Sequence, residues 1–146
     1  MKGYLLDTNI ISKFAPERPA ASPALAGWMH EKGEADELFL SVMTIAEIRK
    51  GIRGLERRGA NTKAAGLQRW FDGMLAIFAD RILVIDTAIA LAAGEIEDHA
   101  LGAGHDPGLA DVIIAATAKV HDLVMVTENR RCFQPLGIPV EAPPID

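Results

Sequence analysis

The apolar residues of this chain fall into short continuous runs that alternate with longer segments of helical spacing. The short runs cover residues 3–6, 38–42, 82–85 and 123–126, and residues 138–140 form a fifth, weaker run. Short apolar runs bounded by polar or turn residues are typical of strands that are buried in a parallel sheet. The pattern therefore predicts a central parallel sheet of four to five strands.

The segments between these runs repeat apolar side chains every three or four residues, as one face of an α-helix does. Ser22 and Asp86 precede two of these segments and are suitable helix N-caps. Strands and helices in alternation imply right-handed crossovers, and so an α/β fold of the three-layer α/β/α sandwich type. Helices are predicted over residues 8–14, 23–32, 44–58, 61–79 and 87–103, and from the turn at residues 106–108 to His121.

Length and composition fit a single domain that spans residues 1–146. Hydrophobic residues make up 49% of the chain and aromatic residues only 5%, which indicates a mainly aliphatic core. No apolar run is long enough to cross a membrane, and Asp7 interrupts any signal-peptide core. Cys132 is the only cysteine, which excludes an internal disulfide and fits a reducing cytoplasm.

Three acidic residues stand where predicted strands end or predicted helices begin. Asp7 follows the first apolar run, Glu47 lies near the start of the helix after the second run, and Asp111 heads the apolar segment 111–118. Ligands of open α/β sheets bind at the carboxyl ends of the strands, so the three carboxylates can converge there. Three carboxylates without matching cations form a site for a hard divalent metal ion such as Mg²⁺.

Each of these acids also has a purely structural interpretation. Asp7 is a possible N-cap of the short helix that follows it, although Thr8 could take that role instead. Thr44 and Glu47 have the spacing of a capping box. Asp111 could complement the dipole of its helix, but a carboxylate beside so apolar a segment is costly unless a cation or donor meets it. The local pattern leaves both interpretations open for each residue.

The net charge of −5 is unusual for a nucleic-acid-binding protein, which is normally basic. The charges are distributed unevenly, however. Residues 49–69 contain seven basic side chains and a single acid, Glu56, whereas residues 95–111 contain five acids and no Lys or Arg. The basic stretch is either a surface that attracts phosphates beside the acidic site or an ordinary solvated helix face.

Several other reaction classes lack their sequence signatures. The chain has no P-loop, no Gly-x-Gly-x-x-Gly segment and no Gly-x-Ser-x-Gly nucleophile elbow. Its four histidines and one cysteine show no paired zinc-ligand spacing. A phosphatase with a nucleophilic aspartate at position 7 would have a second acid at position 9, where this chain has Asn9. Metal-assisted hydrolysis at the three carboxylates is the chemistry that remains.

Four segments carry a more specific combination of residues: 5–12 (LLDTNIIS), 41–48 (SVMTIAEI), 110–118 (ADVIIAATA) and 126–129 (VTEN). In this order and spacing they resemble the PIN-domain ribonuclease toxins of the VapC/FitB type, the toxic halves of bacterial toxin–antitoxin pairs. The resemblance covers essentially the whole chain. It implies a sheet of order 3-2-1-4-5, and it places Asp7, Glu47 and Asp111 on the acidic metal site of the family.

The resemblance implies an Mg²⁺-dependent endoribonuclease, with Mn²⁺ as a possible substitute, that cleaves RNA phosphodiester bonds by metal-activated water. In this mechanism Asp7 and Asp111 hold the metal, and Glu47 orients or deprotonates the attacking water or helps to hold a second ion. The resemblance also implies RNA as substrate, a homodimer, and a cognate antitoxin with a DNA-binding domain that joins it in a larger hetero-oligomer.

The chain departs from the family pattern just after the fourth predicted strand, where members commonly carry a fourth acid. The two candidate positions hold Asn129 and Cys132, and the side chain of the adjacent Glu128 should leave in a different direction. We favour Asn129, which lies closer to the strand end and can hydrogen-bond a water in the site. The departure keeps one alternative open, namely a catalytically weak RNA- and antitoxin-binding module. A second alternative is a small metal-dependent phosphohydrolase on a similar sheet.

Overall fold

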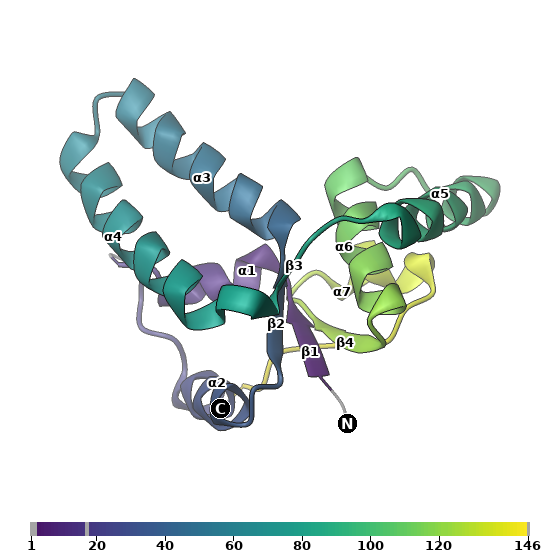
Figure 1. Cartoon of the computed structure of the whole chain (residues 1–146), viewed down its shortest axis with the longest axis horizontal. Helices are drawn as coiled ribbons and strands as arrows, with labels where there is room; N and C mark the ends of the chain where they lie inside the picture. The colour runs from purple at the N-terminus through teal and green to yellow at the C-terminus, as the bar shows by residue number, and fades with distance from the viewer. Residues whose placement is uncertain (1–2, 17, 146) are drawn as a thin grey trace.

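Five parallel strands form one sheet at the centre of the molecule (Figure 1). The computed structural model describes residues 3–16 and 18–145. The sheet order is β3-β2-β1-β4-β5, which confirms the order implied by the resemblance. The strands are β1 (Gly3–Leu6), β2 (Leu38–Ser41), β3 (Ile82–Leu83), β4 (Leu123–Val126) and β5 (Val140–Glu141).

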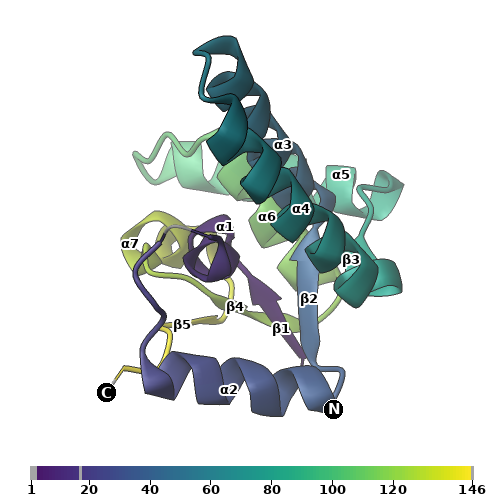
Figure 2. The ribbon, with the colours of Figure 1, turned by 90° about the vertical axis from the view of Figure 1, so that its left-hand side faces the viewer.

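Helices cover both faces of this sheet, so the predicted three-layer sandwich is confirmed (Figures 1 and 2). One face carries α1 (Thr8–Ile11), α2 (Pro23–Glu34), α3 (Val42–Arg57) and α4 (Asn61–Phe78). The other face carries α5 (Thr87–Gly102), α6 (Leu109–Val120) and α7 (Arg130–Phe133). Short 3-10 turns follow α1, α4 and α7, as η1 (Ser12–Phe14), η2 (Ala79–Arg81) and η3 (Gln134–Leu136). No helix in residues 3–16 and 18–145 is long and apolar enough to cross a membrane.

The alternation of side chains along each strand divides the core in two. In β1, Leu5 packs with the helices α5 and α6, whereas Leu6 packs with α1, α3 and α4. In β4, Met125 and Val126 divide in the same way. Strands that bury both faces need apolar residues at every position, which is why the sequence showed continuous runs rather than an alternating pattern.

The register of the two central strands brings their ends together. Leu6 of β1 lies opposite Val126 of β4, and both strands end at that pair. The next residues, Asp7 and Thr127, therefore leave the sheet side by side, and the amide of Asp7 donates to the carbonyl of Val126 at 2.9 Å. This edge of the sheet is where parallel α/β folds place their ligands.

The third strand is shorter than its apolar run. The run 82–85 predicts four residues of strand, but β3 contains only Ile82 and Leu83. Val84 and Ile85 are 65% and 42% exposed. The strand lies at the end of the sheet order, so it has one strand neighbour instead of two, and its apolar residues are not all buried.

The helix that carries Glu47 begins earlier than the pattern predicts. The expected start was Thr44, but α3 starts at Val42, and its N-cap is Ser41, whose hydroxyl accepts a hydrogen bond from the amide of Met43 at 3.0 Å. Strand β2 accordingly ends at Ser41 and not at residue 42. Two further helix caps are as predicted, since Ser22 caps α2 and Asp86 caps α5.

Candidate active site

Asp7 is both a helix cap and a buried carboxylate at the sheet edge. It is the N-cap of α1, and its Oδ1 accepts a hydrogen bond from the amide of Thr8 at 2.9 Å. Its Oδ2 accepts from the hydroxyl of Thr127 at 2.7 Å. Burial raises the pKa of Asp7, while these two hydrogen bonds lower it. The alternative in which Thr8 caps the helix and frees Asp7 is therefore wrong, but capping uses only one of the two oxygens.

Glu47 lies in the second turn of α3, so the capping-box interpretation of Glu47 is also wrong. A capping box needs Thr44 as the N-cap, and the N-cap is Ser41. The Glu47 carboxylate is exposed, and its Oε1 accepts a hydrogen bond from the hydroxyl of Thr8 at 2.7 Å. Glu47 is thus held against the residue that follows Asp7.

Asp111 lies in the first turn of α6 and is half-buried. Burial raises the pKa of Asp111, and the negative charges of Asp7 and Glu47 raise it further. Asp111 is therefore close enough to Asp7 and Glu47 for their charges to act on it. Among the ion pairs of residues 3–16 and 18–145, none joins a Lys, Arg or His to any of the three. The three acids therefore have no cationic side chain as an ion-pair partner among those residues, and a cation or a proton could relieve their negative charge.

A hydrated divalent cation fits these donors better than a bare ion would. Within the described residues, no three His, Cys, Asp or Glu side chains are gathered into a group that could hold a metal ion by themselves. Mg²⁺ usually keeps several waters and is bound through one or two carboxylates together with substrate phosphates. Asp7, Asp111 and Glu47 are all-oxygen donors of this kind, and they could share such an ion through water.

The predicted fourth position lies on the segment between β4 and α7. The side chain of Asn129 is exposed, and its backbone amide donates to the hydroxyl of Thr127 at 2.9 Å. Cys132 is also exposed and, with Asp111, lines a shallow hollow of about 250 Å³. Glu128 forms an ion pair with Lys13 at 2.9 Å, so its side chain leaves in a different direction, as expected.

If the chain cleaves RNA with Mg²⁺, as the resemblance implies, an acid at the fourth position should lower the Mg²⁺ concentration needed for cleavage, because it adds a charged oxygen donor to the site. Cys132→Asp should have the larger effect, since Cys132 shares a hollow with Asp111. Asn129→Asp tests the position that the sequence favoured. The measurement is cleavage rate against Mg²⁺ concentration, with Cys132→Ser as the uncharged control. If neither acid changes the half-saturating concentration, three carboxylates suffice.

Thr127 and Asn9 are site residues that the sequence analysis did not single out. Thr127 is fully buried and donates to Asp7. Its oxygen also lies 3.4 Å from the side-chain amide nitrogen of Asn9, which donates to it. The side-chain Oδ1 of Asn9 in turn accepts from the backbone amide of Glu128 at 3.4 Å. Both residues belong to the segments that carry the resemblance, so the signal was present, but their roles depend on strand register.

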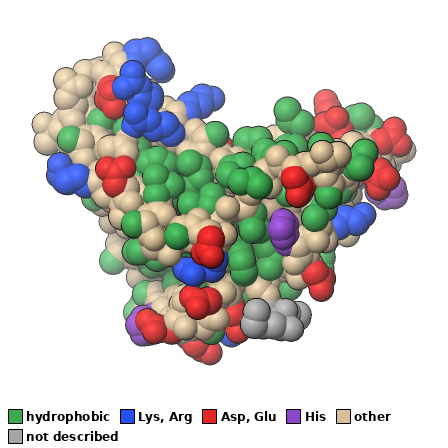
Figure 3. Space-filling model, viewed as in Figure 1, with side chains coloured by type: hydrophobic (Ala, Val, Ile, Leu, Met, Phe, Trp, Pro, Cys, Tyr) green, Lys and Arg blue, Asp and Glu red, His purple; other side chains and the backbone are tan. Residues whose placement is uncertain are grey.

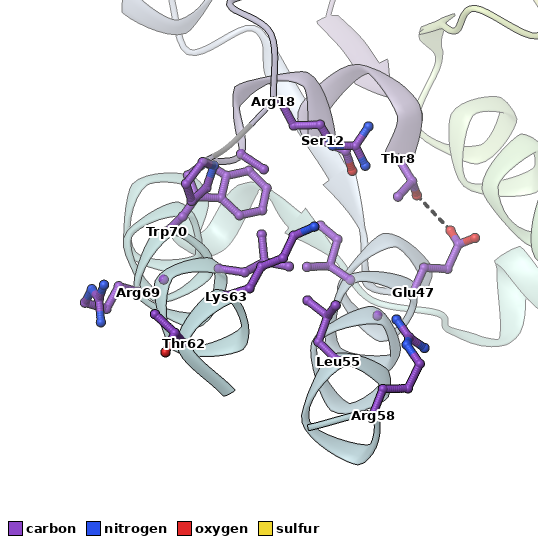
Figure 4. Close-up of a pocket in the computed structure, with 16 residues that line it drawn as sticks. Thr8, Ser12, Arg18, Glu47, Leu55, Arg58, Thr62, Lys63, Arg69 and Trp70 are labelled. Atoms are coloured by element: carbon purple, nitrogen blue, oxygen red, sulfur yellow. Dashed lines mark hydrogen bonds between the residues drawn. The ribbon is translucent and has the colours of Figure 1, made fainter. Parts of the chain in front are cut away.

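A groove of about 570 Å³ opens beside the site, between η1 and the α3–α4 pair (Figure 4). Thr8 and Glu47 lie at one end of it, and Trp70 lies at the other. Apolar side chains and cationic side chains both contribute to its wall. The apolar ones include Ile48, Leu55, Leu67 and Trp70, and the cationic ones are Arg18, Arg58, Lys63 and Arg69.

Comparison with known proteins gives consistent results. The PIN domain family model matches residues 4–137. Toxin FitB of Neisseria gonorrhoeae is 34% identical over 129 residues, which cover 88% of this chain and 89% of that protein. VapC ribonuclease Y4jK of Sinorhizobium fredii is 29% identical over 140 residues, which cover 95% of this chain and 96% of that protein.

Solved structures of similar proteins agree with the sequence comparison. The crystal structure of FitAcB from Neisseria gonorrhoeae matches with a TM-score of 0.83 and 33% identity, covering 96% of this chain and 97% of that chain. The structure of FitAB bound to the IR36 DNA fragment matches with a TM-score of 0.80 and 31% identity, covering 98% and 97% of the two chains.

Proposed function

Because the chain belongs to the PIN-domain family and is homologous to FitB and VapC toxins, we propose that it is an Mg²⁺-dependent endoribonuclease, the toxic component of a toxin–antitoxin pair. One observation carries the proposal. Asp7, Glu47 and Asp111 come from three different elements, and Asp7 and Glu47 raise the pKa of Asp111 across the space between them. A bound cation would relieve this repulsion, and phosphodiester hydrolysis uses such a cation.

The side chains have distinct tasks in the proposed reaction. Asp7 and Asp111 hold the cation, and Mn²⁺ can replace Mg²⁺ there. When bound, Mg²⁺ supplies positive charge that stabilises the negative charge developing on the phosphoryl and leaving oxygens. Glu47 orients the attacking water and accepts its proton, because its carboxylate is exposed and, within residues 3–16 and 18–145, only Oε1 accepts a hydrogen bond from the protein. Thr127 and the amide of Thr8 keep the Asp7 carboxylate oriented.

The direct test is incubation of the purified protein with structured RNA. We expect cleavage with Mg²⁺ or Mn²⁺, its loss with EDTA, and its return when the cation is added back. RNA binding without cleavage would favour the catalytically weak module, for which Asn129 and Cys132 at the fourth position are the supporting observation. Turnover of a generic phosphomonoester without RNA cleavage would favour the small phosphohydrolase.

The basic side chains of α3 and α4 support RNA as the substrate class. The α3–α4 pair projects from the sheet, and Figure 3 shows its Lys and Arg side chains gathered toward the far end. A group of acidic side chains lies on the opposite projection, which α5 forms. A cationic surface next to a carboxylate site attracts the RNA backbone while leaving the site free for a cation. The exposed cations on this pair include Arg49, Lys50, Arg53, Arg57, Arg58 and Lys63.

Charge reversal on this surface should weaken RNA binding and its salt dependence. The binding constant K for RNA falls as salt rises, so a plot of log K against log salt has a negative slope. In Arg53→Glu/Arg57→Glu, each lost phosphate contact should make this slope shallower by about 0.7 for a single strand. Arg53 already pairs with Glu56 at 2.8 Å, so Arg57 should contribute more. The control is Lys119→Glu near the end of α6, just before the amino end of β4. An unchanged slope would identify these side chains as a solvated face or an oligomer contact.

A protein partner is the second part of the proposal. FitAcB, FitAB and VapBC are names of solved complexes that contain similar chains, so we propose an antitoxin with a DNA-binding domain as the partner. The groove beside Glu47 suits an acidic, amphipathic segment of that antitoxin, because it combines apolar side chains with four cations. We further propose a cytoplasmic homodimer that joins the antitoxin in a larger hetero-oligomer.

A further inference from the structure

Thr8 makes hydrogen bonds to two of the three site carboxylates. Its amide donates to Oδ1 of Asp7 at 2.9 Å, and its hydroxyl oxygen lies 2.7 Å from Oε1 of Glu47 (Figure 4). The same hydroxyl oxygen lies 3.0 Å from the hydroxyl oxygen of Thr44. Thr8 of α1 is thus hydrogen-bonded both to Asp7, which precedes it in the chain, and to Glu47 of α3.

The direction of these hydrogen bonds follows from the number of protons. A hydroxyl group carries one proton, and an ionised carboxylate can only accept. Thr8 therefore donates to Glu47, and it receives the proton of Thr44. The resulting series runs from the Thr44 hydroxyl through the Thr8 hydroxyl to the Glu47 carboxylate.

This series holds a side chain that has little else to fix it. Glu47 is exposed and, among the described residues, takes part in no ion pair. Thr44, in contrast, is fully buried on the first turns of α3, so the close packing of the core restricts its side chain. A buried, immobile donor at the start of the series restricts the hydroxyl of Thr8, which then restricts Oε1 of Glu47.

We propose that Thr44 and Thr8 are positioning residues that fix the Glu47 carboxylate relative to Asp7, so that its second oxygen faces the attacking water. The inference rests on the proposed nuclease function for the identity of that water. Thr44 touches neither substrate nor cation and acts only through Thr8. Its burial would otherwise suggest a role in the core alone.

The test removes the Thr44 hydroxyl without changing the shape of the side chain. In Thr44→Val we expect kcat for RNA cleavage to fall about tenfold or more, because loss of an outer hydrogen-bond partner typically lowers activity by that amount. KM should be nearly unchanged, because Thr44 does not touch the substrate. Mn²⁺ binding without RNA, measured by calorimetry, should weaken in the same variant, because Glu47 would share the ion with Asp7 and Asp111 through water. Thr44→Ser retains the hydroxyl and should restore both. In a Glu47→Gln background, Thr44→Val should have little further effect on kcat.

Thr117→Val is the matched structural control. Thr117 is also fully buried on a helix, but its hydroxyl donates to the carbonyl of Ile113 at 2.8 Å and not to the site. Two results would overturn the inference: equal losses of kcat in Thr44→Val and Thr117→Val, or a loss of kcat that only follows a fall in melting temperature. If Thr44→Val does not fold, Thr8→Val interrupts the same series at a half-buried position and should give the same loss.

The proposed function and this inference fail in different ways. Absence of cleavage by the wild-type protein would reject the nuclease function, while the Mn²⁺ affinities of Thr44→Val and Thr44→Ser still report on the hydrogen-bond series. A wild-type protein that cleaves RNA, together with a fully active Thr44→Val, rejects the positioning role alone.

Discussion

Asp7→Asn should abolish RNA cleavage and growth inhibition while the protein remains folded. The substitution keeps the shape of the side chain and removes the charge of the most buried site carboxylate, which is 7% exposed. A neutral amide oxygen binds a hard cation more weakly than a carboxylate does, so the site loses its central ligand. We expect a loss of several orders of magnitude in cleavage rate.

Two opposing effects should leave the stability of the folded protein nearly unchanged in Asp7→Asn. The hydroxyl oxygen of Thr127 already accepts hydrogen bonds from the backbone amide of Asn129 and the side-chain amide of Asn9, so its own proton needs an acceptor at residue 7. The backbone amide of Thr8 needs a second acceptor there. Asparagine has only one acceptor oxygen, so one hydrogen bond is lost, at a cost of about 1 kcal/mol. Because burial raises the pKa of Asp7, removing its charge offsets part of that cost.

Asp86→Asn is the control for the capping role of Asp7. Asp86 caps α5 by accepting from the amide of Ile89 at 2.9 Å, and asparagine caps a helix as well as aspartate does. If Asp7 were only a cap, the two substitutions would have similar small effects on melting temperature and none on cleavage. A well-folded Asp7→Asn protein with full activity would contradict the catalytic assignment.

The sequence was sufficient for the parts of the fold that depend on local pattern. Continuous apolar runs predicted the strands. The predicted first and last residues of β1 and β4 were correct, because both faces of these strands are buried. Ser22 and Asp86 were identified as caps because a capping side chain needs only the next few residues. The location of Asp7 at the sheet edge followed in the same way.

The errors arose where tertiary contacts decide between local alternatives. Thr44 and Glu47 have the spacing of a capping box, but Ser41 is the N-cap of α3, and the Thr44 hydroxyl instead contacts Thr8 of α1. Nothing in the sequence near residue 44 indicates that α1 will pack there. Thr127 was missed for a related reason, since its bond to Asp7 joins residues 120 positions apart and depends on the register of β1 with β4.

Asp111→Asn should abolish cleavage and, unlike most substitutions of a site residue, should also stabilise the protein when no divalent cation is present. Burial and the charges of Asp7 and Glu47 raise the pKa of Asp111 above its value in the unfolded chain. The folded protein therefore binds more protons than the unfolded chain in the interval between the two pKa values. Wild-type stability falls as pH rises through that interval, and the penalty is fully present at neutral pH.

Asparagine at position 111 cannot ionise, so the variant should lack this penalty. We expect its melting temperature to exceed that of the wild type at neutral pH in EDTA, and the difference to shrink as pH falls toward about 4, the ordinary pKa of aspartate. Mg²⁺ should narrow the difference by stabilising the wild type. The control is Asp98→Asn, an exposed carboxylate on α5. If Asp111→Asn is instead the less stable protein at neutral pH, the favourable interaction of Asp111 with the dipole of α6 outweighs the repulsion among the three acids, and the electrostatic argument for a cation at this site fails.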